Sequence, residues 1–121
     1  MIDELIFKID YLKKITNRPW GRYYTIEELQ EKNKIVLKKK LLVIFSKQKI
    51  QLQSHKLKDE YWISNKKFNY LLDGEEYIAE AYTKIFIPKN KIHSIINNSN
   101  EVLYIYEEQI GICDEDDVKK Y

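Results

Sequence analysis

The sequence predicts an all-β domain, built as a sandwich or barrel of short strands. Segments of strand length, with alternating apolar and polar residues, recur at nearly regular spacing between residues 22 and 106. Asp73-Gly74, the strongest hairpin signal in the chain, separates two of these segments. The 13% aromatic content comes mostly from ten tyrosines, which suit strands. At 121 residues the chain is long enough for one hydrophobic core and too short for two ordinary domains.

The first 15 residues follow a different pattern. Their apolar side chains recur at helical spacing, at Ile2, Leu5, Ile6, Ile9, Leu12 and Ile15. We expect a short amphipathic helix that packs on the barrel or forms a dimer contact, because its polar face carries both signs of charge, unlike a membrane-surface helix. Pro19 and Gly21 break the pattern. The predicted organisation is a helical extension over residues 1–16 and a single domain over residues 17–121.

Strands are predicted for residues 22–26, 35–45, 49–55, 59–64, 68–72, 77–81, 84–87, 93–96 and 102–106. A polar connection or helical turn is expected between the first two. One face of the longest strand carries Ile35, Leu37, Leu41, Val43 and Phe45. Lys39 interrupts that face. The acidic tail after Gly111 either caps an end of the barrel or stays loose.

Charge and composition exclude several classes of function. Twenty-one basic and nineteen acidic residues give a net charge of +2, so the sequence has no basic footprint for nucleic acid or membrane. The run Lys38-Lys39-Lys40 is interpreted as a solvated face. Cys113 is the single cysteine, which excludes an intramolecular disulfide and a cysteine-based zinc site.

The N-terminus has none of the features of a secretion signal. Asp3 and Glu4 stand where a signal peptide carries positive charge. No apolar stretch approaches the roughly 18 residues that span a bilayer. A cytoplasmic protein is expected.

The only two histidines, His55 and His93, lie in separate strand-like segments. In a strand over residues 49–55, Gln53 and His55 project from the same face, and Glu60 faces them if the next strand runs back antiparallel. His93, which follows a Pro-x-Asn turn, supplies a fourth ligand. This nitrogen and oxygen set suits zinc, iron, manganese, nickel or cobalt without choosing among them.

Structural roles are the alternatives at these positions. A histidine on a β-strand is often a hydrogen-bonded residue and not a ligand. Trp20 is expected to plug one end of the barrel, with direct substrate contact as its alternative.

Four separated motifs, in the same order, make the chain resemble a cupin. Gln53-x-His55-(x)4-Glu60 is similar to the first cupin motif with glutamine in place of its first histidine, and Pro88-x-Asn90-x-x-His93-x-x-x-Asn97 is similar to the second. More narrowly, the chain resembles the C-terminal isomerase domain of bifunctional mannose-6-phosphate isomerase/mannose-1-phosphate guanylyltransferase enzymes, the type II mannose-6-phosphate isomerase family. The supporting segments are Arg18-Pro19-Trp20-Gly21 with Tyr23, Gln53 to Trp62, and Glu115-Asp116-Asp117-Val118.

The resemblance implies a jelly-roll barrel that holds a divalent metal ion, zinc by expectation, on Gln53, His55, Glu60 and His93. It also implies aldose–ketose isomerisation of a sugar phosphate, with Glu60 and Lys58 as catalytic residues. Lys58 stands where the family has arginine and shares the face of Glu60, so we expect it to contact the phosphate or the enediolate. Up to Tyr121 the sequence lacks the family's Asp-x-Tyr-Gly-Arg ending, and with it a C-terminal arginine that can serve the substrate.

Three functions follow as hypotheses. The first is a metal-dependent, mannose-6-phosphate isomerase-like enzyme of nucleotide-sugar or polysaccharide biosynthesis, acting on a sugar phosphate or nucleotide-sugar. The second is a non-catalytic cupin that binds a sugar or a partner protein. The third, a purely structural barrel, does not require converging Gln, His, Glu and His side chains. We expect a homodimer, with no nucleic acid or membrane partner.

Overall fold

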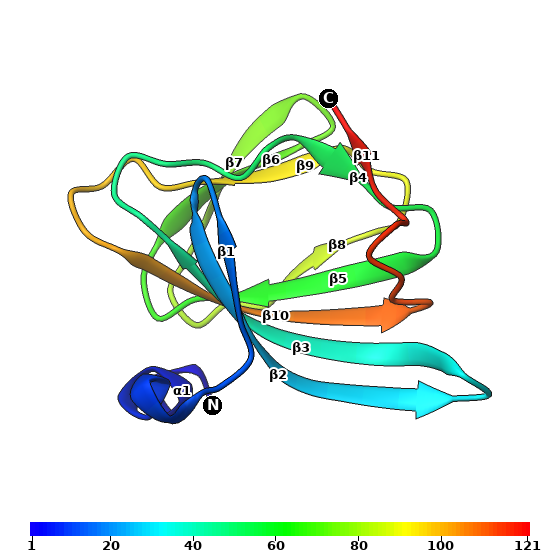
Figure 1. Ribbon diagram of the computed structural model, residues 1–121. Helices are drawn as coiled ribbons and strands as arrows, with labels where there is room; N and C mark the ends of the chain where they lie inside the picture. Colours follow the sequence, from blue (N-terminus) through cyan, green and yellow to red (C-terminus); the bar gives the residue numbers. More distant parts are fainter.

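Two antiparallel sheets face each other and together form a barrel, as the computed structural model of residues 1–121 shows (Figure 1). The six-stranded sheet has the order β1 (Ile15–Arg18), β2 (Gly21–Glu31), β3 (Lys34–Ile44), β10 (Leu103–Gly111), β5 (Lys58–Ile63) and β8 (Ile85–Ile87). The five-stranded sheet has the order β11 (Lys119–Lys120), β4 (Gln53–Ser54), β9 (His93–Ile96), β6 (Phe68–Leu72) and β7 (Glu75–Ala79). The all-β prediction is confirmed.

Two hairpins close with residues in the left-handed region. Asp73 and Gly74 have φ angles of 49° and 85° and join β6 to β7, as predicted. Lys32 and Asn33, with φ angles of 49° and 66°, join β2 to β3. The predicted polar connection over residues 27–34 is therefore wrong. Its residues extend β2 and start β3, because cross-strand pairing satisfies the backbone groups of this charged segment.

The predicted strand over residues 49–55 is also mostly absent. Only a single bridge from Lys49 to Ile96 and the two-residue β4 form there. Moreover, β4 pairs with β9 in one sheet, whereas β5 pairs with β10 and β8 in the other, so the predicted antiparallel pair between these segments is wrong. The chain changes sheets at Lys56 and Leu57, whose backbone amides donate to the Asp117 carboxylate instead of to a neighbouring strand.

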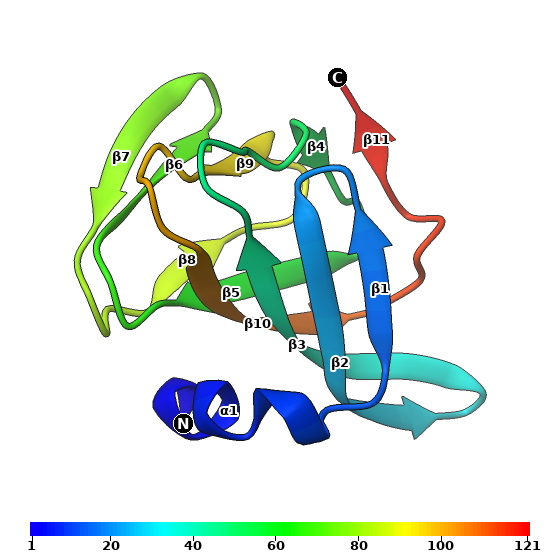
Figure 2. The same cartoon turned by 60° about the vertical axis from the view of Figure 1, so that its left-hand side comes forward.

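The short helix α1 (Ile2–Phe7) and a 3-10 turn (Ile9–Tyr11) lie outside the barrel, against the six-stranded sheet (Figures 1 and 2). Ile2 and Leu5 pack there on Leu41 and Val43. The helical pattern stops short of the expected residue 15, because Ile15 pairs with Tyr24 as the first residue of β1. No helix in the structure has the length and apolar character needed to cross a lipid bilayer.

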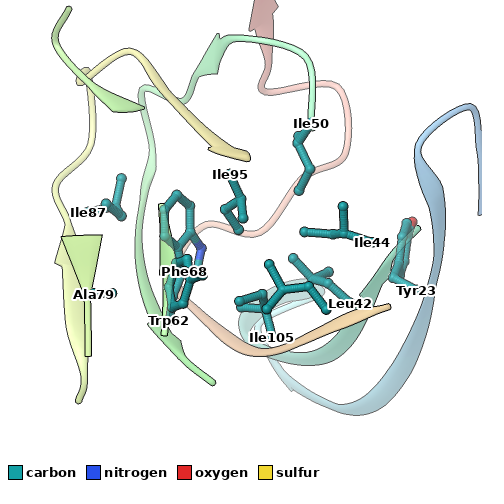
Figure 3. Close-up of a cluster of buried hydrophobic side chains, with 11 residues drawn as sticks. Tyr23, Leu42, Ile44, Ile50, Trp62, Phe68, Ala79, Ile87, Ile95 and Ile105 are labelled. Atoms are coloured by element: carbon teal, nitrogen blue, oxygen red, sulfur yellow. The ribbon is translucent and has the colours of Figure 1, made fainter. Parts of the chain in front are cut away.

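Buried hydrophobic side chains from both sheets form a core between them (Figure 3). The inward-facing side chains of β3, β10 and β5 change from apolar to polar along each strand. The apolar end includes Leu42, Ile44, Ile105 and Trp62, and the polar end includes Lys38, Lys40, Glu107, Gln109, Lys58 and Glu60. One end of the barrel is therefore a packed core, and the other is a polar site.

Candidate metal centre

His55, Glu60 and His93 converge inside the barrel. Glu60 lies in the middle of β5, His55 directly follows β4, and His93 begins β9. Their ligand atoms all lie within 4.8 Å of one another. The Nε2 atom of His55 is 2.9 Å from Oε2 of Glu60, and that of His93 is 3.6 Å from Oε1. All three residues are buried. Two sheets thus present two imidazoles and one carboxylate to a single point.

Hydrogen bonds on the far side of each imidazole determine which nitrogen is free. The Nδ1 atom of His55 lies 2.7 Å from the carbonyl oxygen of Asp117, and that of His93 lies 2.9 Å from the carbonyl oxygen of Lys91. Because a carbonyl oxygen only accepts, Nδ1 carries a proton in both rings, and in a neutral ring Nε2 then presents a lone pair. Both Nε2 atoms are buried without a hydrogen-bond partner. In this tautomer the 2.9 Å contact between His55 Nε2 and Glu60 Oε2 brings together two hydrogen-bond acceptors.

This donor set fits a metal ion. Two neutral imidazole nitrogens beside an ionised carboxylate are an arrangement that borderline divalent cations bind. Orientation of each ring by a second hydrogen bond is also typical of metal-ligating histidines. A cation between the three groups removes the unfavourable juxtaposition of lone pairs.

The pKa values of Glu60 and His55 also favour positive charge at this point. Burial opposes ionisation of Glu60, but contact with His55 and the charge of His93 outweigh it, so the pKa of this carboxyl lies well below its usual range. Burial likewise opposes protonation of His55, but the neighbouring Glu60 raises its pKa. For His93, burial is the larger effect and the pKa is lowered. An ionised Glu60 is thus balanced by a cation, either a proton on His55 or a metal ion.

A cavity of about 580 Å³ lies at the polar end of the barrel and contains most of the predicted site residues. Its wall includes Gln53, His55, Lys58 and Glu60. The half-buried Gln53 is held next to His93 by backbone pairing between β4 and β9. All four predicted ligand positions therefore lie at this end of the barrel.

Three residues of the segment Arg18-Pro19-Trp20-Gly21 line this cavity. Arg18, Pro19 and Trp20 line it, and Trp20 is half-buried against the apolar core. Trp20 therefore packs on the core, and part of its surface also faces the cavity.

A chain of buried side chains connects Lys58 to Glu60 through the neighbouring strand. Lys58 Nζ donates to Gln109 Oε1 at 3.0 Å, and Gln109 Nε2 donates to Glu107 Oε2 at 3.0 Å. Trp62 Nε1 then donates to both Glu107 and Glu60, at 3.1 Å and 3.2 Å. Burial, together with the charge of Glu60, raises the pKa of Glu107 to about 7. The Glu60 carboxylate is thus held by Trp62, and the Lys58 ammonium by Gln109.

Sequence reasoning missed Glu107 and Gln109. The last strand was predicted to end at Tyr106, but β10 continues to Gly111. A signal was present, since polar residues at positions 107 and 109 keep the inward parity of Ile105. In a polar cavity this parity marks site residues and not solvent-facing ones.

The interpretation of Lys38 and Lys40 as solvated residues is wrong. They are 6% and 5% exposed and point inward from β3, whereas Lys39, between them, points outward and pairs with Glu27. Both buried ammonium groups contact Glu115 of the acidic tail. Cys113 is buried as well, and burial raises the pKa of its thiol.

The chain was compared with known protein families, curated proteins and solved structures. Residues 8–121 match the family described as the mannose-6-phosphate isomerase C-terminal domain. No curated protein gives a significant match.

Several solved structures share the fold at low sequence identity. The capsular polysaccharide assembling protein CapF from Staphylococcus aureus has a TM-score of 0.75 at 12% identity, over 88% of this chain and 31% of CapF. KdgF from Halomonas sp. has a TM-score of 0.70 at 12% identity, over 88% and 93%. The cupin domain of Cnp3 from Schizosaccharomyces pombe has a TM-score of 0.65 at 9% identity, over 82% and 69%. The predicted cupin fold is confirmed.

Proposed function

Because the chain belongs to the family of the mannose-6-phosphate isomerase C-terminal domain, we propose that it is a metal-dependent isomerase that interconverts an aldose phosphate and a ketose phosphate. The observation that carries this proposal is the convergence of two buried, oriented imidazoles on Glu60 at the wall of an open polar cavity.

In this proposal His55, Glu60 and His93 hold a divalent metal ion, with Gln53 as the fourth ligand and zinc as the expected ion. When bound, such an ion supplies a Lewis acid for the carbonyl and hydroxyl oxygens of the substrate. The protein contributes a rigid ligand shell, because the carbonyl oxygens of Asp117 and Lys91 orient the two rings and Trp62 holds the carboxylate.

Lys58 is the proposed cationic group for the reacting oxygens. Its ammonium is buried and held by Gln109, two residues before Glu60 on the same face of β5. A fixed positive charge in a site of restricted water stabilises the negative charge that develops on an enediolate oxygen. Trp20 lines the cavity, and Trp62 lies in the apolar core next to Glu60.

The test is a coupled assay that interconverts mannose 6-phosphate and fructose 6-phosphate. Apo protein is reconstituted with Zn²⁺, Co²⁺ or Mn²⁺, and the variant Glu60→Gln serves as the inactive control. We expect turnover in at least one reconstituted form and none in the variant. Full metal occupancy without turnover in any form contradicts the isomerase.

A non-catalytic, sugar-binding cupin is the second candidate. It is favoured by Lys58, which stands where the family has arginine and whose ammonium is already engaged by Gln109. Lysine provides one point charge and not a bidentate fork. This candidate predicts that the metal-loaded protein binds mannose 6-phosphate in calorimetry without converting it.

The wider setting proposed for the protein is nucleotide-sugar or polysaccharide biosynthesis in the cytoplasm. The family match and the resemblance of the fold to CapF support a role with sugars. A homodimer is proposed as the working form. Light scattering tests this directly, and a mass equal to one chain contradicts it.

A further inference from the structure

Two lysines are buried at the polar end of the barrel, outside the proposed metal ligands. Lys38 and Lys40 lie two residues apart on the inward face of β3, and their side chains are only 8% and 6% exposed. Burying an ammonium group is costly unless it is paired with an anion. Lys40 and Glu115 line the cavity, and Lys38 reaches it through its contact with Glu115, so this part of the wall requires negative charge.

The tail segment between β10 and β11 provides that charge. Glu115 Oε1 accepts from Lys38 Nζ at 2.6 Å and from Lys40 Nζ at 3.2 Å. This carboxylate is half exposed, whereas both lysines are enclosed. The remaining neighbours are weaker partners, since Glu28 lies 3.6 Å from Lys38 and Lys40 rests 4.1 Å above the ring of Tyr23.

Strand register places the lysines relative to the metal centre. Lys38 pairs with Gln109 on β10, and Gln109 pairs in turn with Glu60 on β5. Two steps between adjacent strands separate Lys38 from Glu60, which is roughly 10 Å at the backbone. This separation suits a chain of six carbons whose one end lies at Glu60 and whose other end carries a charged group. The intervening Glu107 is held by Trp62 and Gln109.

We propose that Lys38 and Lys40 form a phosphate subsite of the cavity, in which the phosphate monoester of the substrate replaces the carboxylate of Glu115. This inference rests on the proposed function in taking a sugar phosphate as ligand. A phosphate dianion offers three oxygens and two charges to the two ammonium groups, whereas Glu115 shares a single oxygen between them. The displaced carboxylate moves into water, which already reaches half of it, and the phosphate takes over its pairing with the two ammonium groups.

The subsite also separates two roles. The family resemblance left Lys58 as the contact for either the phosphate or the enediolate. With the phosphate on Lys38 and Lys40, Lys58 is free to serve the reacting oxygens beside Glu60. A nucleotide-sugar diphosphate has the same oxyanion chemistry, and the binding experiment distinguishes it from a monoester.

Calorimetric titration of the metal-loaded protein with mannose 6-phosphate, mannose, inorganic phosphate and GDP-mannose tests the subsite. The double variant Lys38→Met/Lys40→Met keeps the bulk of both side chains and removes both charges. Lys39→Met, on the opposite face of the same strand, is the matched control. The double variant should lose about 100-fold in affinity for mannose 6-phosphate, the effect of two charge-assisted hydrogen bonds. Lys39→Met should bind as the wild type does.

Glu115→Gln provides an independent gain-of-affinity test. It removes the competing charge, so inorganic phosphate should bind several-fold more tightly than to the wild type. This arm decides the matter if the double variant does not fold. Unchanged affinity in both variants, an equal loss in Lys39→Met, no detectable binding of phosphate or mannose 6-phosphate to the wild type, or tighter binding of GDP-mannose than of the monoester overturns the subsite.

The outcomes also separate the subsite from the isomerase. Wild-type protein that binds mannose 6-phosphate through these lysines without turnover keeps the subsite and contradicts the isomerase. Turnover with a KM that does not change in the double variant keeps the isomerase and contradicts the subsite.

Discussion

His55 Nε2 lies 2.9 Å from Glu60 Oε2, although the two residues belong to opposite sheets. His55 follows β4 of the five-stranded sheet, and Glu60 lies in β5 of the six-stranded sheet. The contact therefore bridges the two layers at the open end of the barrel. Any ion held there links both sheets, so the proposed metal should stabilise the fold as well as the site.

Replacing Lys58 should separate catalysis from metal binding. In Lys58→Met the positive charge beside Glu60 is lost, and we expect kcat/KM for mannose 6-phosphate to fall by about 100-fold, the usual effect of removing one electrostatic stabiliser. Lys58→Arg, which restores the family's residue, should retain at least the wild-type activity. Metal content should be the same in all three proteins. Equal activity of Lys58→Met and wild type contradicts the assigned role.

Glycine at position 111 should be required for the close approach of β10 to the backbone of Leu57 and Lys58. Gly111 has a φ of 133°, pairs with Lys58, and a Cβ there would lie 2.3 Å from the carbonyl oxygen of Leu57. Gly74, with a φ of 85° and open space around it, is the matched control. Chemical denaturation should show a loss of about 1 kcal/mol for Gly74→Ala, from backbone strain alone, and a clearly larger loss for Gly111→Ala. Similar losses at both positions would show that the close approach is unimportant.

The Glu115 contact should make stability depend on acid pH. Although burial opposes ionisation, the charges of Lys40 and Lys38 lower the pKa of Glu115 to about 2, from an ordinary value of 4.5. Because the folded-state pKa is depressed, this contribution is fully present above pH 4.5 and is lost as the pH falls toward 2. Thermal unfolding followed over this range should show a shallower decline in Glu115→Gln than in wild type. Parallel curves would mean that the carboxylate contributes nothing.

The N-terminal helix should stabilise the barrel through one face only. Leu5 is buried on the outer face of the six-stranded sheet, whereas Phe7 is 92% exposed. Leu5→Ala should lower the free energy of unfolding by about 2–5 kcal/mol, since it leaves a cavity. Phe7→Ala should change it by less than about 0.5 kcal/mol. Urea titration of the two variants measures both effects.

Local signals in the sequence predicted those parts of the fold that depend on local chemistry. The hairpin at Asp73-Gly74 and the strand parity of Lys58 and Glu60 agree with the structure. The convergence of His55 with Glu60 was also predicted, but by a wrong route through adjacent strands. Periodicity indicates which residues of a strand share a face. The sheet that a strand joins depends on its pairing with strands far away in the sequence, and local periodicity does not reveal that pairing.

The buried lysines show a second limit. In a strand that alternates polar and apolar residues, the polar residues normally face water. The sequence alone therefore predicts that Lys38 and Lys40 are exposed. The inside of this barrel is itself polar at one end, which reverses the rule there. Burial of Leu41 and Val43 on the opposite face adds to the ambiguity, because α1 covers the outside of the sheet. Both faces of β3 are thus buried from Lys40 to Ile44, and only the three-dimensional arrangement shows which face belongs to the site.

Metal content per chain tests directly whether His55, Glu60 and His93 hold an ion. Wild-type protein, His55→Ala, His93→Ala and the control Gln51→Ala, an exposed residue of the cavity rim, are purified and analysed by mass spectrometry for bound transition metals. We predict about one ion per chain in wild type and in Gln51→Ala, and almost none in either histidine variant, because each loses an oriented nitrogen ligand. Stoichiometric metal in both histidine variants, or no metal in wild type after growth and reconstitution with zinc, cobalt or manganese, would contradict the proposed metal site.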